Sequence, residues 1–401
     1  MKELVETLAA WRAEGVEVGR AVVVRTFGSA PRPEGSVLLL ASDGRIAGSV
    51  SGGCVEGAAA EEIARARAEG RSRVIRYGIS DEQAWDVGLA CGGTIDVLVE
   101  PLVRPEIEEA ARLTAGFGQG SSTASDLRSG PSLSPARAVV TPLPSDAPGP
   151  EVGSHGPGPG ESPRDVVVAW EDGRLDGTLG DAALDAELAR VAANALLRGT
   201  SRTVQVGGRS LFIEAFSRRP RLIIVGAVQV AIALVAIART LGYETVVVDG
   251  RPAFATRERF PDADRLVVGW PDEVADGIGL GPADAVAVLS HDVKFDEPAI
   301  ATALGRGCRY VGAVGSRKTQ ADRRARLRAA GIGEEDLVRL RGPIGLDLGG
   351  RNPAEVALAI MAEVVAARYG ASGRPMLDRA LEPPPERAAG NASPSRPAAV
   401  R

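Results

Sequence analysis

Two cysteines that each adjoin a glycine pair are the side chains of this sequence best suited to chemistry. Cys54 lies in GSVSGGCVEG, residues 48–57, and Cys91 opens CGG, residues 91–93. A thiolate is a nucleophile and a soft-metal ligand, and glycines allow another group to approach the backbone closely. We therefore expect soft-metal or sulfur chemistry at a surface shared by these loops, with Gly92 and Gly93 part of it. Two small buried hydrophobic side chains would leave the same pattern.

The segment around Cys54 has the features of an anion site. The run AAAEEIARARAEG that follows it predicts a helix. Ser51, Gly52, Gly53 and Cys54 should then lie near a helix N-terminus, where free N–H groups favour anions and lower the pKa of a thiol. Glu56 falls in the first helical turn, either as a site residue or as a capping acid.

A second loop is expected to accompany them. FGSAPRPEGS, residues 27–36, is stiffened by two prolines and carries Arg32. Such a loop can present backbone amides and a guanidinium to an anion.

Imidazole chemistry has few candidates. The chain has three cysteines and two histidines, which excludes zinc fingers, multi-histidine metal sites and disulfide scaffolds. His155 lies in a Gly/Ser/Pro-rich stretch, and Cys308 opens an apolar strand, where we expect it in the core. His291 is left as the imidazole for acid–base work, or as a structural histidine.

The C-terminal half contains a turn where a dinucleotide fingerprint belongs. GAVQVA, residues 226–231, begins with Gly226 after an apolar strand and opens a helix. Asp249 ends the next strand, where an acid binds ribose, and Arg251 follows, to pair with a phosphate or in a surface ion pair. Val228 replaces the glycine that lets the backbone approach pyrophosphate, so NAD(P) binding is weakened.

Further polar residues follow other strands of this half. They are His291-Asp292, Gly315-Ser316-Arg317 and residues 342–355. Open α/β sheets bind ligands at the carboxyl ends of their strands, so we include Gly315, Ser316 and Arg317 among the binding residues.

The elements that position these residues form two kinds of domain. From Arg221 onward, apolar strands alternate with amphipathic helices, which predicts a Rossmann-like, doubly wound parallel sheet. Upstream, residues 43–73 align without gaps with residues 172–202, which predicts a duplicated α+β domain. The second copy has Ala183 and Val206 where the first has Cys54 and Cys91, so the first copy is expected to carry the site. Neutral drift would also explain this difference.

These patterns divide the chain into five segments. We expect a first copy at 1–113, a Gly/Ser/Pro-rich linker at 114–164, the second copy at 165–217, the Rossmann-like domain at 218–381 and a disordered tail at 382–401.

Charge and hydropathy limit the function classes. A net charge of −5 argues against a nucleic-acid partner. The N-terminus lacks the apolar core of a signal peptide, and the uncharged stretch 222–238 reads as a strand, a turn and a helix rather than a membrane span. We expect a cytoplasmic protein.

Several of these motifs together resemble the XdhC/CoxI family of molybdenum-hydroxylase maturation proteins. GSAPRPEGS, GSVSGGCVEG and CGG are similar to its N-terminal domain. GYETVVVDGRPAFATRERFPDAD, LSHDVKFDEPAI, YVGAVGSRKT and PIGLDLGGRNPAEVALAIMAEVVA resemble its Rossmann domain. The chain departs from the family at GAVQVA, where members commonly show GAGHVA.

The resemblance implies a chaperone that assists maturation rather than an enzyme that turns over a substrate. Such proteins bind the molybdenum cofactor, molybdopterin, while a cysteine desulfurase exchanges an oxo for a sulfido ligand. They then deliver it to a xanthine-dehydrogenase- or CO-dehydrogenase-type apoenzyme. Cys54 and Cys91 would hold or shield the molybdenum, with Arg32 and glycine amides on the anionic part.

Two alternatives stay open at this point. One is an NAD(P)-dependent oxidoreductase with the dinucleotide at Gly226 and Asp249 and with His291 as acid–base group. The other is a thiol redox or sulfur-relay protein that uses Cys54 and Cys91 as an exchanging pair. A homodimer is also expected, because the small duplicated domain has a limited core.

Overall fold

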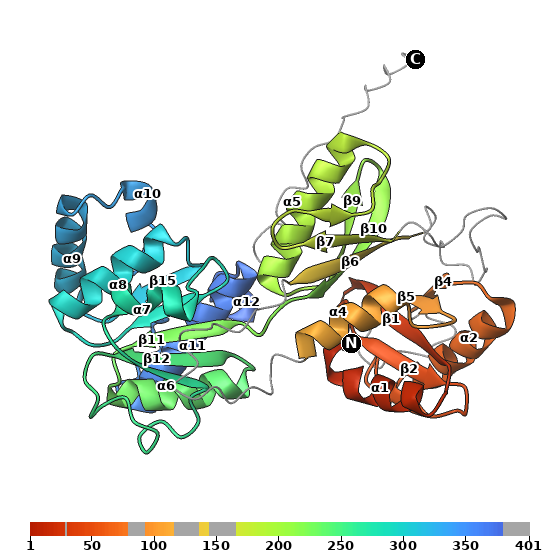
Figure 1. The fold of residues 1–401 in the computed structure, drawn as a ribbon, viewed down its shortest axis with the longest axis horizontal. Helices are drawn as coiled ribbons and strands as arrows, with labels where there is room; N and C mark the ends of the chain where they lie inside the picture. The colour runs from red at the N-terminus through yellow and green to blue at the C-terminus, as the bar shows by residue number, and fades with distance from the viewer. Residues whose placement is uncertain (29, 79–92, 116–135, 144–165, 380–401) are drawn as a thin grey trace, which may run out of the picture.

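The chain folds into three β-sheets that follow one another along the sequence (Figure 1). The computed structural model describes residues 1–28, 30–78, 93–115, 136–143 and 166–379. Cys91, Gly92, His155 and the expected tail at 382–401 lie outside the described residues.

The first sheet is antiparallel, with the strand order β3-β2-β1-β5-β4. Its strands are β1 (Val18–Phe27), β2 (Val37–Ala41), β3 (Ile46–Gly48), β4 (Arg73–Tyr77) and β5 (Thr94–Glu100). The helices around it are η1 (Lys2–Leu4), α1 (Val5–Ala13), α2 (Glu56–Glu69) and α4 (Pro105–Ala115). α2 buries Ala59, Ile63 and Ala66, which recur at helical spacing, against one face, and α1 and α4 cover the other.

The second sheet repeats the first strand for strand, with the order β8-β7-β6-β10-β9. Its elements are β6 (Arg137–Pro142), β7 (Val167–Trp170), β8 (Leu175–Asp176), α5 (Ala182–Arg198), β9 (Arg202–Val206) and β10 (Arg209–Phe216). The identical order confirms the duplicated α+β domain.

The prediction that residues 114–164 form a linker is wrong in part, because a strand of the second sheet lies within them. This strand is β6, which stands at the centre of the second sheet as β1 does in the first. Alternate side chains of RAVVTP bury against opposite faces, among them Val139 and Val140. The second copy therefore begins upstream of the expected residue 165.

The two copies are joined by an apolar cluster and a buried ion triad. Val22 of β1 packs in one cluster with Val139 of β6 and Phe212 of β10. Within this interface, fully buried Arg20 of β1 pairs with Glu100 of β5 and, at 2.8 Å, with Glu214 of β10. A charged side chain with partners in both sheets fixes how one copy sits on the other.

The third sheet has six parallel strands in the order β13-β12-β11-β14-β15-β16. Its strands are β11 (Arg221–Val225), β12 (Glu244–Asp249), β13 (Arg265–Val268), β14 (Ala285–Val288), β15 (Tyr310–Ala313) and β16 (Leu340–Arg341). Its helices are α6 (Gln229–Thr240), α7 (Pro271–Ile278), α8 (Val293–Gly305), α9 (Arg317–Ala329), α10 (Glu334–Leu337), α11 (Pro353–Tyr369) and α12 (Met376–Arg379).

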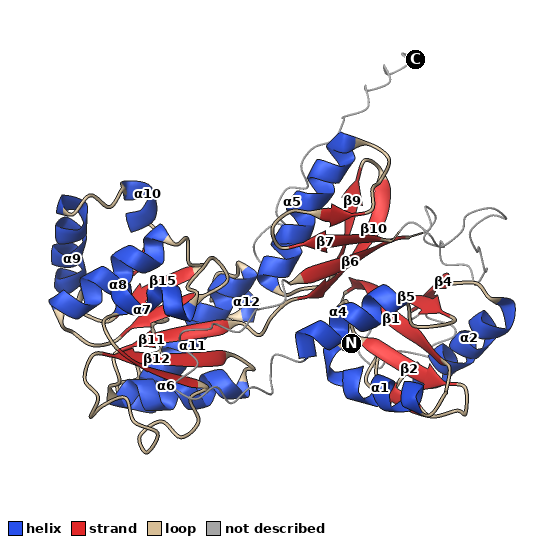
Figure 2. Ribbon diagram, in the orientation of Figure 1, coloured by secondary structure: helices blue, strands red, loops and turns tan. Residues whose placement is uncertain are grey.

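Helices cover both faces of this sheet (Figure 2), which confirms the Rossmann-like fold. α6 and α11 pack on one face, and α7, α8 and α9 on the other. Stretch 222–238 is divided between β11 and α6, and no helix of the described chain is long and apolar enough to cross a membrane.

The sheets are arranged so that the first copy and the third sheet lie toward opposite ends of the molecule. α2 and the Rossmann helix α9 lie at opposite ends of the long axis in Figure 1. The second copy meets the third sheet through α5 and α11, where Arg198 donates to the carbonyl of Tyr369 and Arg368 donates to that of Arg198.

Candidate functional site

The loop before α2, residues 48–57, is organised by the carboxylate of Glu56. We call it the thiol loop. Glu56 Oε1 accepts from Ser49 Oγ at 2.6 Å and from the N–H groups of Val50, Ser51 and Gly52. Its Oε2 accepts from Ser51 Oγ at 2.7 Å and from Gly53 N at 2.8 Å. Burial alone raises the pKa of Glu56, but hydrogen bonds from Ser49 and Ser51 bring it down to about 2.

This arrangement corrects one expectation for the loop. The N–H groups of Gly52 and Gly53, expected to be open to an anion, donate to Glu56 instead. The two glycines are needed for the backbone path, since their φ angles are +83° and +120°. Added Cβ atoms would meet nothing within 4 Å at either position, so the tip of the loop is open to solvent.

Cys54 is exposed at this tip. Its N–H and that of Val55 donate to Ser51 Oγ, each at 3.0 Å, so the backbone that carries the thiol is fixed. The loop therefore presents a thiol to solvent on an ordered backbone.

The second copy keeps the carboxylate and drops the thiol. Asp185, at the position matching Glu56, accepts from Thr178 Oγ1 and Leu179 N, which match Ser49 and Val50. Asp181 stands where the first copy has Gly52, and it caps α5 by accepting from Ala183 N and Leu184 N. The carboxylate is thus common architecture, whereas the glycine tip and the thiol belong to the first copy.

The other predicted residues of the first copy gather at the same end of the first sheet. Phe27, the end of β1, pairs with Thr94, the start of β5, directly after Gly93. Arg32 is exposed in the connection between β1 and β2, and no ion pair of the described residues includes it. Cys91 and Gly92 precede this end but lie outside the described residues, so the pairing of Cys54 with Cys91 stays a prediction.

The Rossmann turn has its expected conformation, but Asp249, which was expected to bind ribose, bonds to the protein itself. Gly226 has φ +105°, and a Cβ there would lie 2.9 Å from the N atom of Ser290. Asp249 accepts from Ala227 N at 2.8 Å, which ties the end of β12 to this turn. Val228, at the position of the second glycine of a dinucleotide fingerprint, is the N-cap of α6, and its partly buried side chain packs against the apolar cluster on that face of the sheet.

Asp249 is fully engaged by its neighbour Arg251. The guanidinium donates through Nε at 2.9 Å and through a terminal nitrogen at 2.8 Å, and the Arg251 N–H adds a third bond. Burial raises the pKa of Asp249, but these bonds outweigh it and lower the pKa below its usual range. A ribose would have to displace Arg251 from Asp249, which argues against the NAD(P)-dependent oxidoreductase.

A cleft of about 180 Å³ opens beside this ion pair at the carboxyl ends of the strands. We call it the C-terminal cleft. Its lining residues come from the ends of β12, β13 and β14 and from α8, and they are Asp249, Gly250, Arg251, Trp270, Ser290, Asp292 and Phe295. The sequence motifs predict Asp249, Arg251 and Asp292 from this set but miss Trp270 and Phe295. A tryptophan placed directly after a strand of a parallel sheet was the available signal.

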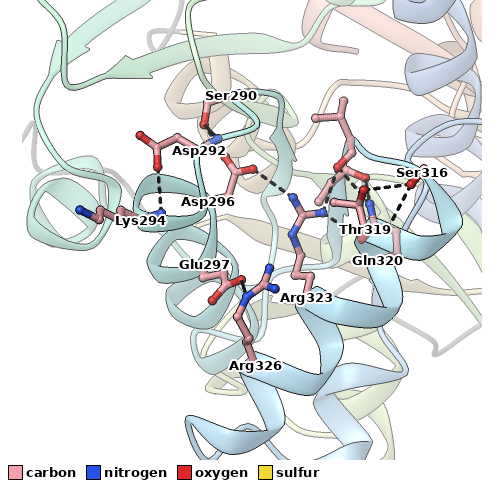
Figure 3. Close-up of polar contacts among 12 residues, drawn as sticks. Ser290, Asp292, Lys294, Asp296, Glu297, Ser316, Thr319, Gln320, Arg323 and Arg326 are labelled. Atoms are coloured by element: carbon pink, nitrogen blue, oxygen red, sulfur yellow. Dashed lines mark hydrogen bonds and ion pairs between the residues drawn. The ribbon is translucent and has the colours of Figure 1, made fainter.

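A polar network lies behind the cleft (Figure 3). Ser290 Oγ donates to buried Asp296, which also accepts from Arg323 at 3.0 Å. Arg323 donates in turn to Gln320, whose amide donates to the carbonyls at the end of β15. Burial raises the pKa of Asp296, although the Ser290 hydrogen bond and Arg323 oppose this shift. The network fixes Ser290 in the cleft wall.

The remaining predicted residues of this half do not line the cleft. His291 is exposed in the turn between β14 and α8, in a left-handed conformation with φ +66°. Ser316 caps α9 by accepting from Thr319 N, and Gly315 makes the turn before it. Arg317 is exposed at the first position of α9. Buried Cys308 belongs to the core, as expected, and burial raises its pKa to about 12.

Comparisons with known proteins agree with both halves of this description. Residues 11–78 match the model of the XdhC and CoxI family, and residues 222–364 match that of the XdhC Rossmann domain. The chain is 26% identical over 350 residues to a probable xanthine dehydrogenase subunit of Bacillus subtilis, covering 87% of this chain and 92% of the relative.

Two further similarities extend over nearly the whole chain. The molybdenum cofactor insertion chaperone PaoD of Escherichia coli is 27% identical over 369 residues, covering 90% of this chain and 88% of the relative. A solved structure described as a xanthine dehydrogenase from Bacillus halodurans shares the fold, with a TM-score of 0.61 and 24% identity. The match covers 92% of this chain and 96% of that one.

Proposed function

Because this chain belongs to the XdhC and CoxI family, we propose that it binds the molybdenum cofactor and assists its sulfuration and insertion. The cofactor, a pterin dithiolene with a phosphate, is cargo here, and the chain itself turns over no substrate. Its partners are a cysteine desulfurase and a xanthine-dehydrogenase- or CO-dehydrogenase-type apoenzyme, met in the cytoplasm. The similarity to a relative named as a cofactor insertion chaperone supports this proposal.

The observation that carries the proposal is the exposed thiol of Cys54 on an ordered loop. A thiolate is a soft ligand, which suits a metal centre already bound by dithiolene sulfur. Glu56 fixes the loop in advance, so little conformational entropy is lost when Cys54 meets its ligand. The matching residue of the second copy is Ala183, so the thiol is not required by the fold.

Because Glu56 is negatively charged, we propose that the metal end and the anionic end of the cofactor bind to different residues of the first copy. A carboxylate directly beneath the glycine tip disfavours a phosphate there. In this proposal Cys54 contacts the metal end, Cys91 is the second thiol, and exposed Arg32 on the neighbouring loop attracts the anionic end.

The test is to purify the protein from a cofactor-producing host and to measure molybdenum and pterin per chain. Molybdenum is measured by mass spectrometry and pterin by the fluorescence of its oxidised form. The wild-type chain is expected to retain both in equal amounts, and Cys54→Ala to lose most of both. Moving the thiol to the second copy, with Cys54→Ala and Ala183→Cys together, should not restore retention.

Two outcomes count against the proposal in different ways. A wild-type chain that carries neither molybdenum nor pterin contradicts the chaperone function. Full retention by Cys54→Ala, with the fold intact by circular dichroism, contradicts the role of this thiol alone.

A further inference from the structure

The C-terminal cleft contains an aromatic wall, a fixed guanidinium and a carboxylate, and the proposed role of the thiol loop uses none of them. We propose that this cleft binds a flat nitrogen heterocycle whose edge carries adjacent N–H donors. That edge is the 2-amino-4-oxopyrimidine unit, which pterins share with guanine. The thiol loop and this cleft lie in opposite halves of the molecule (Figure 1), so a ring bound here belongs to another molecule than the cofactor whose metal end contacts Cys54, and the inference goes beyond the proposed function.

The aromatic wall supplies a surface on which a flat ring can stack. Trp270 and Phe295 form a tilted pair with centroids 5.5 Å apart and an interplanar angle of 59°. Phe295 is buried, whereas 43% of Trp270 is exposed, so the indole is the member of the pair with a free surface. Stacking on an aromatic side chain is favourable for any heterocyclic ring, because each has a π face.

Arg251 supplies a second flat surface in the same cleft. Its guanidinium is held in one plane by the paired bonds to Asp249, and it lies 3.9 Å from the centroid of the Phe254 ring. Arginine planes stack on aromatic and heterocyclic rings. Because Asp249 and Phe254 already fix the side chain, binding a ring costs little further entropy.

Asp292 supplies the selectivity. One of its oxygens, Oδ1, accepts from Lys294 N at 3.0 Å and caps α8, and the side chain is otherwise exposed at the cleft. An ionised carboxylate only accepts hydrogen bonds and can take two parallel N–H donors. The 2-amino-4-oxopyrimidine edge offers two such donors side by side. Adenine offers one amino group beside a ring acceptor, so it fits poorly.

The size of the cleft fits a ring system rather than a whole cofactor. Its volume of about 180 Å³ is several times the roughly 30 Å³ that a water occupies in the liquid. It is smaller than the roughly 300–1,000 Å³ of pockets that enclose a drug-sized ligand. We therefore place the ring in the cleft and the rest of the ligand outside it, along the carboxyl ends of the strands.

Isothermal titration calorimetry of the full chain with three probes tests this inference. The probes are 6-hydroxymethylpterin, guanosine 5′-monophosphate and adenosine 5′-monophosphate. We expect both of the first two to bind at least about tenfold more tightly than the adenine nucleotide. Tighter binding of the pterin identifies a pterin as the natural source, and tighter binding of the guanine nucleotide identifies a nucleotide.

Asp292→Asn is the decisive variant, because asparagine also caps helices and so should leave α8 in place. It is expected to weaken binding of the pterin and the guanine nucleotide by at least about tenfold while leaving the adenine nucleotide unchanged or improved. Asp181→Asn is the matched control, since Asp181 caps α5 in the same way in the second copy. Trp270→Leu should weaken all three probes.

The inference is overturned if the adenine nucleotide binds as tightly as the guanine nucleotide, or if Asp292→Asn changes neither donor-edged probe. Absence of binding by both of these probes up to about 1 mM also overturns it. Its failure is distinct from failure of the proposed function. Molybdenum retention without ring binding leaves the chaperone standing, and ring binding without molybdenum retention leaves the cleft standing.

Discussion

The six hydrogen bonds that Glu56 accepts come from five consecutive residues, 49–53. One carboxylate therefore replaces the many separate contacts that an exposed loop would need to hold one conformation. Asp185 of the second copy accepts from two of the matching positions. The backbone of the thiol loop is therefore held by more hydrogen bonds to its carboxylate than the matching loop of the second copy is held by Asp185.

Replacing Glu56 tests this interpretation at the level of one residue. Glu56→Gln keeps the size but turns two acceptors into one acceptor and one donor, which faces N–H groups. We expect it to lower the free energy of unfolding by about 2–4 kcal/mol, measured in urea, and to speed the reaction of Cys54 with a thiol reagent. Asp185→Asn should cost about 1 kcal/mol. Equal effects of the two substitutions would contradict the special role of Glu56.

The same variant should alter the pH dependence of stability. The pKa of Glu56 is about 2 in the folded protein, below the ordinary value of 4.5. Its contribution is therefore complete above the unfolded pKa and is lost as pH falls from 4.5 toward 2. Between about pH 5 and pH 2, the stability of Glu56→Gln should fall less steeply than that of the wild-type chain.

At the scale of the element, the turn from β11 to α6 depends on a glycine that no other residue replaces. A Cβ on Gly226 would lie within about 3.1 Å of three atoms of Ser290, two of them backbone atoms that cannot rotate away. Gly226→Ala should therefore destabilise the Rossmann domain by about 2–4 kcal/mol, measured by thermal unfolding. Gly242→Ala is the matched control, since Gly242 has φ +77° but open space around its Cβ. It should cost about 1 kcal/mol.

Much of the fold could be predicted from the sequence because its elements repeat or alternate. The gapless repeat predicted two like copies, and the apolar strands after Arg221 predicted the parallel sheet. β6 was missed because six residues of strand pattern stand between long Gly/Ser/Pro-rich stretches, and strand pairing over such separations leaves no local signal.

The site was harder to predict because its hydrogen bonds join residues that composition cannot pair. Glu56 was expected either to bind a ligand or to cap α2. The number of hydrogen bonds that it accepts depends on the conformation of residues 49–53, which the sequence does not specify. The pairing of Asp249 with Arg251 needed the exact turn after β12. Trp270 follows β13, and Ser290 and Asp292 follow β14, which is separated from β13 in the sheet by β12 and β11. Trp270 reaches this part of the cleft by packing on Phe295 of α8, a contact that the order along the chain does not state.

At the scale of the whole molecule, the triad around Arg20 holds the two copies together. Arg20→Met would leave Glu100 and Glu214 buried without their shared cation, although Arg104 also contacts Glu100. We expect a loss of about 3–5 kcal/mol in urea unfolding. The triple variant Arg20→Met, Glu100→Leu, Glu214→Leu should recover most of it, because apolar side chains need no charged partner. A single variant as stable as wild type would contradict this account.

The separation of the thiol loop and the C-terminal cleft predicts that they act independently within one chain. They lie in opposite halves of the molecule (Figure 1), with the second copy between them. Cys54→Ala should leave ring binding to the cleft within about twofold, and Asp292→Asn should leave the thiol reactivity of Cys54 unchanged. Energetic coupling above about 1 kcal/mol in the double variant would show that the two halves communicate.

In the ion pair between Asp249 and Arg251, the guanidinium occupies the carboxylate that would otherwise bind the sugar of a ligand. A sugar hydroxyl that approaches Asp249 meets a guanidinium on the same chain, at an effective concentration that a free ligand does not match. The affinity of the C-terminal cleft for a nucleotide should then depend on the ring and not on the sugar. Guanosine and deoxyguanosine 5′-monophosphates should bind within about twofold of each other, and a roughly tenfold preference for ribose would mean that Arg251 releases Asp249.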